Sequence, residues 1–223
     1  MSTIIPVHGN YQELESYRNC VIIYDGTVDF CNRFLRVGDR TVDQMIQAAR
    51  SGKQNIVEGS MASGTSTETE IKLIGVARAS LEELLEDYRD HLRTRDLPQW
   101  EKTDPRILAI RELSCRKDRT YETYKTYLEQ GHNSPELFCN VMISLIHQTN
   151  YLLDRNLKSL EEQFAEKGGI REQMHRTRNV EKNEQQEKAL SLLREIYREL
   201  ATLNQPKLME KVTQVAEILK NKL

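Results

Sequence analysis

Apolar residues recur at helical spacing between Arg40 and Leu92, where they form two separate stripes. Each stripe would lie along one face of a helix and therefore needs a packing partner. A small polar segment, residues 60–67, separates the two. The pattern predicts two long antiparallel helices that pack on each other across a short hairpin. The stripes consist of Val42, Met45, Ile46, Ala49 and Ile56, then Ile71, Ile74, Ala77, Leu81, Leu84, Leu85, Tyr88 and Leu92.

Local signals predict where these two helices begin and end. Thr41 with Gln44, and Thr67 with Glu70, match the capping box, in which two side chains satisfy two backbone N–H groups. Gly59 suits a left-handed helix cap and predicts that the first helix ends close to it.

Asn55 and Glu58 lie three residues apart, on neighbouring positions of one helical face. We interpret them as side chains that hydrogen-bond within or between helices, since buried polar groups need partners. No His or Asp motif stands beside them to support a catalytic role.

Three further segments have helical spacing. The first runs from residue 10 to about residue 37, after a loose N-terminal arm. The second runs from Pro105 to about Glu129, where Asp104 suits the N-cap and Pro105 the first helical position. A basic cluster inside it leaves a bend or two shorter helices open. The third begins at Ser134-Pro135 by the same logic and runs to about Phe164.

These helices together predict an all-α fold, an antiparallel up-and-down four-helix bundle. The segment at about 93–132 would be a helical insertion between the third and fourth helices. Lys167-Gly168-Gly169 predicts a boundary, which gives a bundle over 1–167 and a helical extension over 168–223. In that extension, a polar stretch precedes two amphipathic segments separated by Pro206. We expect an appended helical hairpin, and a coiled coil between subunits is the alternative.

Composition agrees with an all-α protein, because aromatic residues make up 6% and charged residues 30%, with only five prolines and ten glycines. The first residues lack a basic region followed by an apolar core, and no apolar run approaches the roughly 20 residues that span a bilayer. We therefore expect a soluble, cytoplasmic protein that does not enter membranes. The four cysteines are scattered without a C-x-x-C pair, which favours reduced thiols: Cys20, Cys31, Cys115 and Cys139.

No catalytic or cofactor-binding motif is evident, so we expect no enzyme activity, cofactor or metal. The carboxylates between Glu82 and Asp87 could suggest a di-metal site, but such sites need Glu-x-x-His pairs on other helices. Neither His91 nor His147 has a Glu three residues earlier. Glycine-rich phosphate-binding motifs are also missing from the sequence.

Two basic clusters are candidates for contacts with nucleic acid. The first would place cations on one face of a helix, where they could meet phosphates. The second lies near Arg111, Tyr121 and Tyr124, on which bases could stack. The alternative is a solvated surface with glutamate partners, since the formal net charge of the chain is -2. The clusters consist of Lys167, Arg171, His175, Arg176 and Arg178, and of Arg116, Lys117 and Arg119.

Several of these features resemble a known family. The segments Asn55-Ile-Val-Glu58-Gly59 and Ala77-x-Ala79-Ser80-x-Glu82-Glu83-Leu84, joined by a Ser/Thr-rich hairpin, are similar to the bacterial four-helix bundle proteins once called 23S rRNA intervening-sequence proteins. The same superfamily includes the accessory protein of diversity-generating retroelements. The similarity covers about Tyr11 to Leu92 and the helix from Pro135. Asn150 to Arg155, Phe164 and Gly168 to Glu172 resemble a branch with a C-terminal suffix.

The resemblance implies a four-helix bundle that often assembles as a ring-shaped homopentamer. In the retroelement branch it also implies binding to RNA and to a reverse transcriptase. We therefore expect a non-enzymatic homo-oligomeric scaffold that binds RNA or DNA, a partner protein, or both. The alternative is an assembly module that interacts only with proteins.

Overall fold

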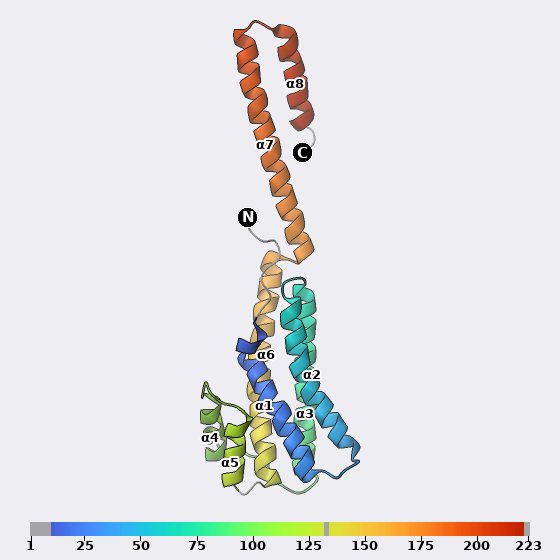
Figure 1. Cartoon of the computed structure of the whole chain (residues 1–223), viewed down its shortest axis with the longest axis vertical. Helices are drawn as coiled ribbons and strands as arrows, with labels where there is room; N and C mark the ends of the chain where they lie inside the picture. Colours follow the sequence, from blue (N-terminus) through green and yellow to red (C-terminus); the bar gives the residue numbers. More distant parts are fainter. Residues whose placement is uncertain (1–9, 132–133, 221–223) are drawn as a thin grey trace. The chain divides into compact units, whose positions relative to one another are not determined.

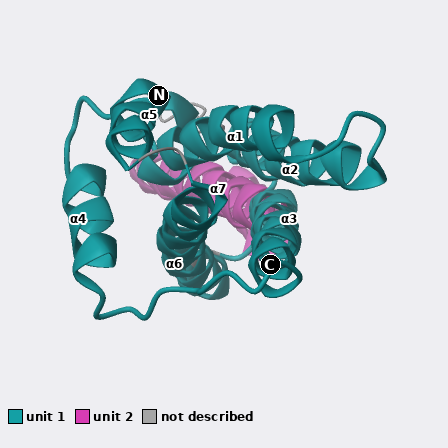
Figure 2. Cartoon of the chain, turned by 90° about the horizontal axis from the view of Figure 1, so that it is seen from below, with its two compact units in different colours: residues 1–169 teal, residues 170–223 magenta. Residues whose placement is uncertain are grey.

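The computed structural model describes residues 10–131 and 134–220, except the side chain of Lys167. Within these ranges all regular structure is helical, as the sequence predicted. The chain divides into two compact units, residues 1–169 and 170–223, two residues beyond the predicted boundary (Figure 2). Along unit 1 lie a short 3-10 helix (Tyr11–Glu13), α1 (Glu15–Phe34), α2 (Arg40–Ala62), α3 (Thr67–Arg93), α4 (Pro105–Ser114), α5 (Tyr121–Gln130) and α6 (Pro135–Lys167).

Four long helices of unit 1 contact one another in a closed cycle. α2 packs on α1 and α3, and α6 packs on the other sides of α1 and α3. Consecutive members of the cycle run in opposite directions (Figure 1). The shorter helices lie outside this cycle, α4 against α6 and α5 against α1. This packing buries the apolar stripes of all four long helices in one shared core.

Aromatic rings occupy the centre of that core. The Phe30 ring lies 5.0 Å from the ring of Tyr88 and 5.5 Å from that of Phe138, measured between centroids. All three residues are fully buried. The Tyr88 hydroxyl is 3.0 Å from the hydroxyl of Thr27, so the one polar atom on these rings has a partner. Rings from α1, α3 and α6 thus join three helices of the cycle.

The predicted α2–α3 pair is present, but its ends differ from the prediction. Asp39 caps α2 by accepting a hydrogen bond from the Thr41 N–H at 2.9 Å, so Thr41 is not the cap. Ser66 caps α3 through the Thr69 N–H at 3.1 Å, one residue before the predicted Thr67. α2 also continues three residues past Gly59.

Gly59 and a second α2 glycine act in packing. A Cβ atom on Gly59 would lie 3.3 Å from Ile74 Cδ1, and one on Gly52 would lie 2.9 Å from Leu81 Cδ2. Both glycines let α2 approach the stripe of α3 closely. Gly75 on α3 does not have this function, because no neighbouring atom would lie within 4 Å of a Cβ there.

The other predicted segments also appear with modified bounds. The first is interrupted, because the 3-10 helix ends at Leu14, an extended residue from which α1 begins. The insertion forms two short helices, α4 and α5, which is one of the two arrangements left open. Proline-led starts are confirmed at both positions: Asp104 accepts from Arg106 N–H at 2.9 Å, and Ser134 accepts from Leu137 N–H at 3.1 Å. α6 ends where Gly168 adopts a φ of 70°, as a helix-stopping glycine can.

Unit 2 is a hairpin of α7 (Ile170–Thr202) and α8 (Pro206–Lys220), which pack against each other. Helix also extends over residues 170–189, the polar stretch that precedes the two predicted amphipathic segments. No residue of α7 or α8 is buried among those described. Neither in this unit nor in unit 1 does a described helix combine the length and apolar character needed to cross a membrane.

Candidate binding surfaces

The hairpin of unit 2 exposes large apolar side chains on both of its helices. The exposed fractions of Leu192 on α7 and Ile218 on α8 are 60% and 59%. Six further large apolar residues of the unit are also exposed: Val180, Ile196, Tyr197, Leu203, Leu208 and Val215. These eight residues are distributed over α7, the turn after it and α8, and we call them the hairpin stripe. Because two helices alone bury little of such a stripe, the hairpin has an apolar surface available for another molecule.

The first predicted basic cluster lies at the start of α7. Arg171, His175, Arg176 and Arg178 are all exposed within its first turns. The spacing puts Arg171, His175 and Arg178 on one helical face, as predicted. His175 Nδ1 lies 3.3 Å from the amide nitrogen of Asn179, and Arg176 also interacts with neighbouring groups. The remaining member, Lys167, has a side chain outside the described part of the structure.

The second predicted cluster is divided between the surface and the interior. The side chain of Arg119 is only 6% exposed and forms an ion pair with Glu15 of unit 1. It also donates to Asn19 Oδ1 and to the Arg116 carbonyl, both at 2.9 Å. Arg119 therefore attaches the insertion to α1 and is not available to a phosphate. Arg116 is exposed but pairs with Asp118 at 3.1 Å, and Lys117 is exposed.

The two tyrosines beside this cluster are structural: Tyr124 joins α5 to α4, and Tyr121 joins α5 to α1. Tyr124 is fully buried, with its hydroxyl 3.0 Å from the Ser114 hydroxyl. Tyr121 donates to Asp29 Oδ2 at 2.5 Å, which joins α5 to α1. Burial and this carboxylate raise the pKa of Tyr121. The Tyr124 ring has no exposed surface on which a base could stack, and the Tyr121 hydroxyl is bound to α1, so these residues hold the insertion in place.

The polar pair of α2 is separated in the structure. Asn55 donates to the Ser51 carbonyl at 2.9 Å, and the Ser51 hydroxyl lies 2.9 Å from the Ser80 hydroxyl of α3. This chain of contacts supports the structural interpretation of Asn55. Glu58 is exposed, and no hydrogen bond joins it to Asn55 among the described residues. Thr67 is the first residue of α3, and partial burial raises the pKa of Glu70.

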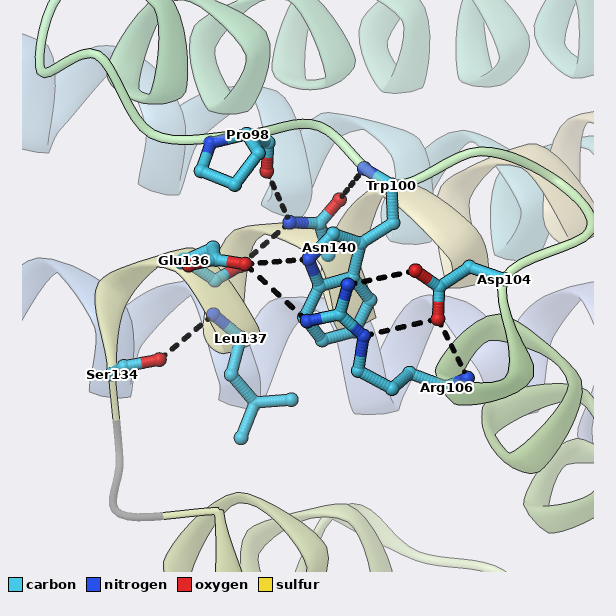
Figure 3. A network of polar contacts seen from close by, with 8 residues as sticks. All are labelled: Pro98, Trp100, Asp104, Arg106, Ser134, Glu136, Leu137 and Asn140. Carbon is cyan, nitrogen blue, oxygen red and sulfur yellow. Dashed lines mark hydrogen bonds and ion pairs between the residues drawn. The ribbon is translucent and has the colours of Figure 1, made fainter.

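A polar network that sequence reasoning missed holds the segment between α3 and α4 against α6 (Figure 3). Asn140 accepts from the Trp100 backbone N–H at 2.8 Å and donates to the Pro98 carbonyl at 3.0 Å. The Trp100 indole N–H donates to Glu136 at 2.6 Å. The guanidinium of Arg106 stacks 3.7 Å from the Trp100 ring centre and pairs with Asp104 at 2.7 Å. The only sequence signal was that this is the single tryptophan of the chain.

Comparison with known proteins does not assign the chain to a family. No protein-family model, no curated protein and no solved structure matches it. Within the described residues, no group of three or more His, Cys, Asp or Glu side chains is arranged to hold a metal ion. The binding surfaces must therefore be judged from their own chemistry.

Proposed function

We propose that this protein is a non-enzymatic homo-oligomeric scaffold. Residues 1–167 act as an antiparallel up-and-down four-helix bundle with a helical insertion. The cyclic contacts of α1, α2, α3 and α6 support this topology. In this proposal the hairpin of unit 2 makes the contact between copies of the chain. The bundle type is that of the intervening-sequence protein superfamily, and the resemblance of residues 47–88 to that family supports it.

The hairpin stripe is the observation that carries the proposal. A helix gains most of its stability by burying an apolar face, yet no described residue of α7 or α8 is buried. A second hairpin with the same stripe would convert two helices into four, which is enough to enclose a core. The same surface would then be used on both copies, as in a two-fold symmetric interface. The mixed charge of residues 170–223, eleven Lys and Arg against eight Glu, leaves little net repulsion between copies.

The test is the molar mass of the full chain in solution, measured by light scattering coupled to size exclusion. The wild type should exceed the 26.0 kDa monomer. Leu192→Glu combined with Ile218→Glu should reduce the mass, because each carboxylate would have to enter an apolar interface. Val76→Glu is the matched control, since Val76 is an exposed apolar residue on α3 with an exposed fraction of 47%.

Two results would overturn this role for the hairpin. One is a monomeric wild type at micromolar and higher concentrations. The other is an assembly that survives the double substitution but dissociates with Val76→Glu, which would assign the contact to the bundle. A mass retained by the double variant, including the five-fold mass that the family resemblance implies, would likewise assign the contact to another surface.

Binding of RNA is a second candidate function, supported by the exposed cations at the start of α7. Arg171→Gln with Arg178→Gln should weaken the retention of a single-stranded RNA in a filter assay and flatten its dependence on salt, because fewer counterions are released. Lys207→Gln with Lys211→Gln removes the same charge from α8 and should change binding less. Absence of binding by the wild type at low salt would refute this function and leave assembly alone.

A further inference from the structure

A groove of about 790 Å³ lies on the surface of unit 1 beside the Trp100 network. α6 contributes Ile143, Ser144 and His147 to its lining. α4 and the segment before it form one side, and Arg89 of α3 reaches the other. Pockets that hold small organic ligands typically enclose about 300–1,000 Å³, so the volume is in the range for such a ligand.

Three cations from three different segments converge on this groove. Arg89 comes from α3, Lys102 from the segment between α3 and α4, and Arg111 from α4. Arg89 is paired with Glu86 at 2.6 Å. Lys102 and Arg111, in contrast, have no hydrogen bond or ion pair with any described residue, and both are exposed. Glu101 is the one carboxylate among the described residues that line the groove.

The surroundings and the pKa of His147 are consistent with a positive potential in the groove. Its Nε2 atom lies 3.4 Å from Arg89 Nη2. Partial burial lowers the pKa of His147, the charges of Arg89 and Lys102 lower it further, and Glu82 acts in the opposite direction. The imidazole is therefore mostly neutral at neutral pH and can accept or donate a hydrogen bond. No hydrogen bond links His147 to Ser144 in the described structure, so the groove lacks the nucleophile–base pair of a hydrolase.

The remaining lining adds flat and apolar surface to these polar groups. Ile107 and Ile143 contribute aliphatic surface, and the ring of Tyr151 is 62% exposed at the margin. Ser144 and Gln148 add an hydroxyl and an amide, 3.3 Å apart, that can bond a ligand. An anionic group at one end and a flat apolar group at the other would match this distribution.

The Trp100 network keeps the groove in shape without a ligand. Trp100 is 8% exposed, with its backbone and its indole both hydrogen-bonded to α6. Asn140 is 1% exposed and also donates to the Glu136 carbonyl at 2.9 Å. These contacts hold the segment from Pro98 to Trp100 against α6 (Figure 3), and Lys102 follows two residues later in the chain. A site that is already ordered loses less entropy on binding.

We propose that this groove binds a small organic phosphate, a phosphate monoester attached to a flat ring. The phosphate lies between Lys102, Arg111 and Arg89, and the ring lies against Ile143 and Tyr151. This site is separate from the hairpin and does not depend on the function proposed for the whole chain.

Trp100 supplies the measurement, since it is the only tryptophan and lines the groove. Adenosine 5′-monophosphate should change the emission of Trp100 saturably, with a dissociation constant that rises with salt. Adenosine lacks the charge and should bind at least about tenfold more weakly, the equivalent of about 1.4 kcal/mol. Inorganic phosphate lacks the ring and should compete only weakly. Calorimetry on the same samples excludes an optical artefact.

Charge variants test which residues hold the phosphate. Lys102→Gln with Arg111→Gln should weaken binding of the monophosphate at least about tenfold, because two charge-assisted hydrogen bonds are lost. Glu101→Gln should strengthen binding, since it removes the nearby negative charge. Arg116→Gln, in the same insertion but outside the lining of the groove, should leave binding unchanged. The melting temperature verifies folding, and neither Lys102 nor Arg111 has a hydrogen bond or ion pair to a described residue that its loss would break.

Three outcomes would overturn the proposal. Equal affinity for adenosine and its monophosphate would remove the role of the phosphate. Unchanged affinity in the Lys102 and Arg111 variant would place the ligand elsewhere. Binding of a single-stranded oligoribonucleotide through these residues, without binding of the monophosphate, would make the groove part of an RNA interface.

Discussion

The two units of this chain use the same sequence pattern with opposite results. In unit 1 the stripes of α2 and α3 are enclosed, and residues such as Ile56 and Leu84 have no exposed surface. In unit 2 the stripe of α8 is equally regular, yet Val215 and Ile218 remain 46% and 59% exposed. The difference lies in the number of neighbours, because α2 packs between α1 and α3, while among the described residues the main packing partner of α8 is α7. Amphipathic spacing therefore predicts that a helix needs a partner, but not that the same chain supplies it.

The largest expected effect comes from the core of unit 1. Phe30→Ala should lower the free energy of unfolding by about 3–5 kcal/mol, because it removes the ring that contacts Tyr88 and Phe138 and leaves a cavity. Leu192→Ala on the hairpin should change the free energy of unfolding of unit 1 by less than about 0.5 kcal/mol. Urea unfolding followed by Trp100 emission measures unit 1 in both variants. A comparable decrease of the free energy of unfolding in the two variants would mean that the two units unfold together.

A smaller effect should separate two glycines within the α2–α3 pair. Gly52→Ala should destabilise unit 1 by about 1–2 kcal/mol, since its Cβ would lie 2.9 Å from Leu81 Cδ2 and 3.0 Å from Leu81 Cγ. Gly75→Ala meets no neighbour within 4 Å and should stabilise the helix by up to about 1 kcal/mol. Thermal unfolding followed by circular dichroism shows whether each substitution lowers or raises the stability. A stabilising Gly52→Ala would show that the close approach of α2 and α3 can relax.

The smallest expected effect is on the pH dependence of stability. Two side chains of α3, Asp87 and His91, contribute to it with opposite signs. Burial, with a smaller effect of Arg95, lowers the pKa of His91 to about 4. The unfolded state binds this proton first, so His91 makes stability fall as the pH drops from about 6.5 towards 4. Burial, with Glu83 and Asp90, raises the pKa of Asp87 to about 6. Asp87 is protonated first in the folded state, so it makes stability rise as the pH falls from about 6 to 4.

Single substitutions should reveal the two opposing slopes. His91→Phe should leave a protein that gains stability relative to the wild type on acidification across pH 6 to 4, because only the Asp87 contribution remains. Asp87→Asn should leave one that loses stability faster than the wild type over the same interval. Urea unfolding at several pH values gives the slopes. Parallel curves for the wild type and both variants would show that neither group titrates differently in the folded state.

Local features of the sequence predicted much of unit 1. The Asp104-Pro105 and Ser134-Pro135 starts are confirmed because each depends on groups two or three residues apart. The starts of α2 and α3 were misassigned where two capping residues compete within a few positions. Asp39 was preferred to Thr41, and Ser66 to Thr67. Which of two nearby residues caps the helix depends on how the helices pack, and the local sequence pattern does not contain that information.

The residues with the most distant partners could not be predicted. Arg119 had the appearance of a surface cation, yet its partner Glu15 lies 104 residues away in the chain. Asn140 and Trp100 are 40 residues apart, and neither belongs to a recognisable motif. The groove beside them arises only when α3, α4 and α6 come together. The sequence left the helix over the first half of α7 open for a different reason, since this stretch has few apolar residues and thus no stripe.

The thiols of this chain differ in a way that is useful for chemistry at the bench. Cys20, Cys31 and Cys139 are buried, and burial raises the pKa of each of these thiols, whereas Cys115 is exposed at the end of α4. Alkylation depends on an accessible thiolate, so a maleimide dye should attach to the native protein at Cys115 alone. The wild-type chain therefore has one site for a fluorescent or spin label, and this site lies in the same insertion that borders the groove.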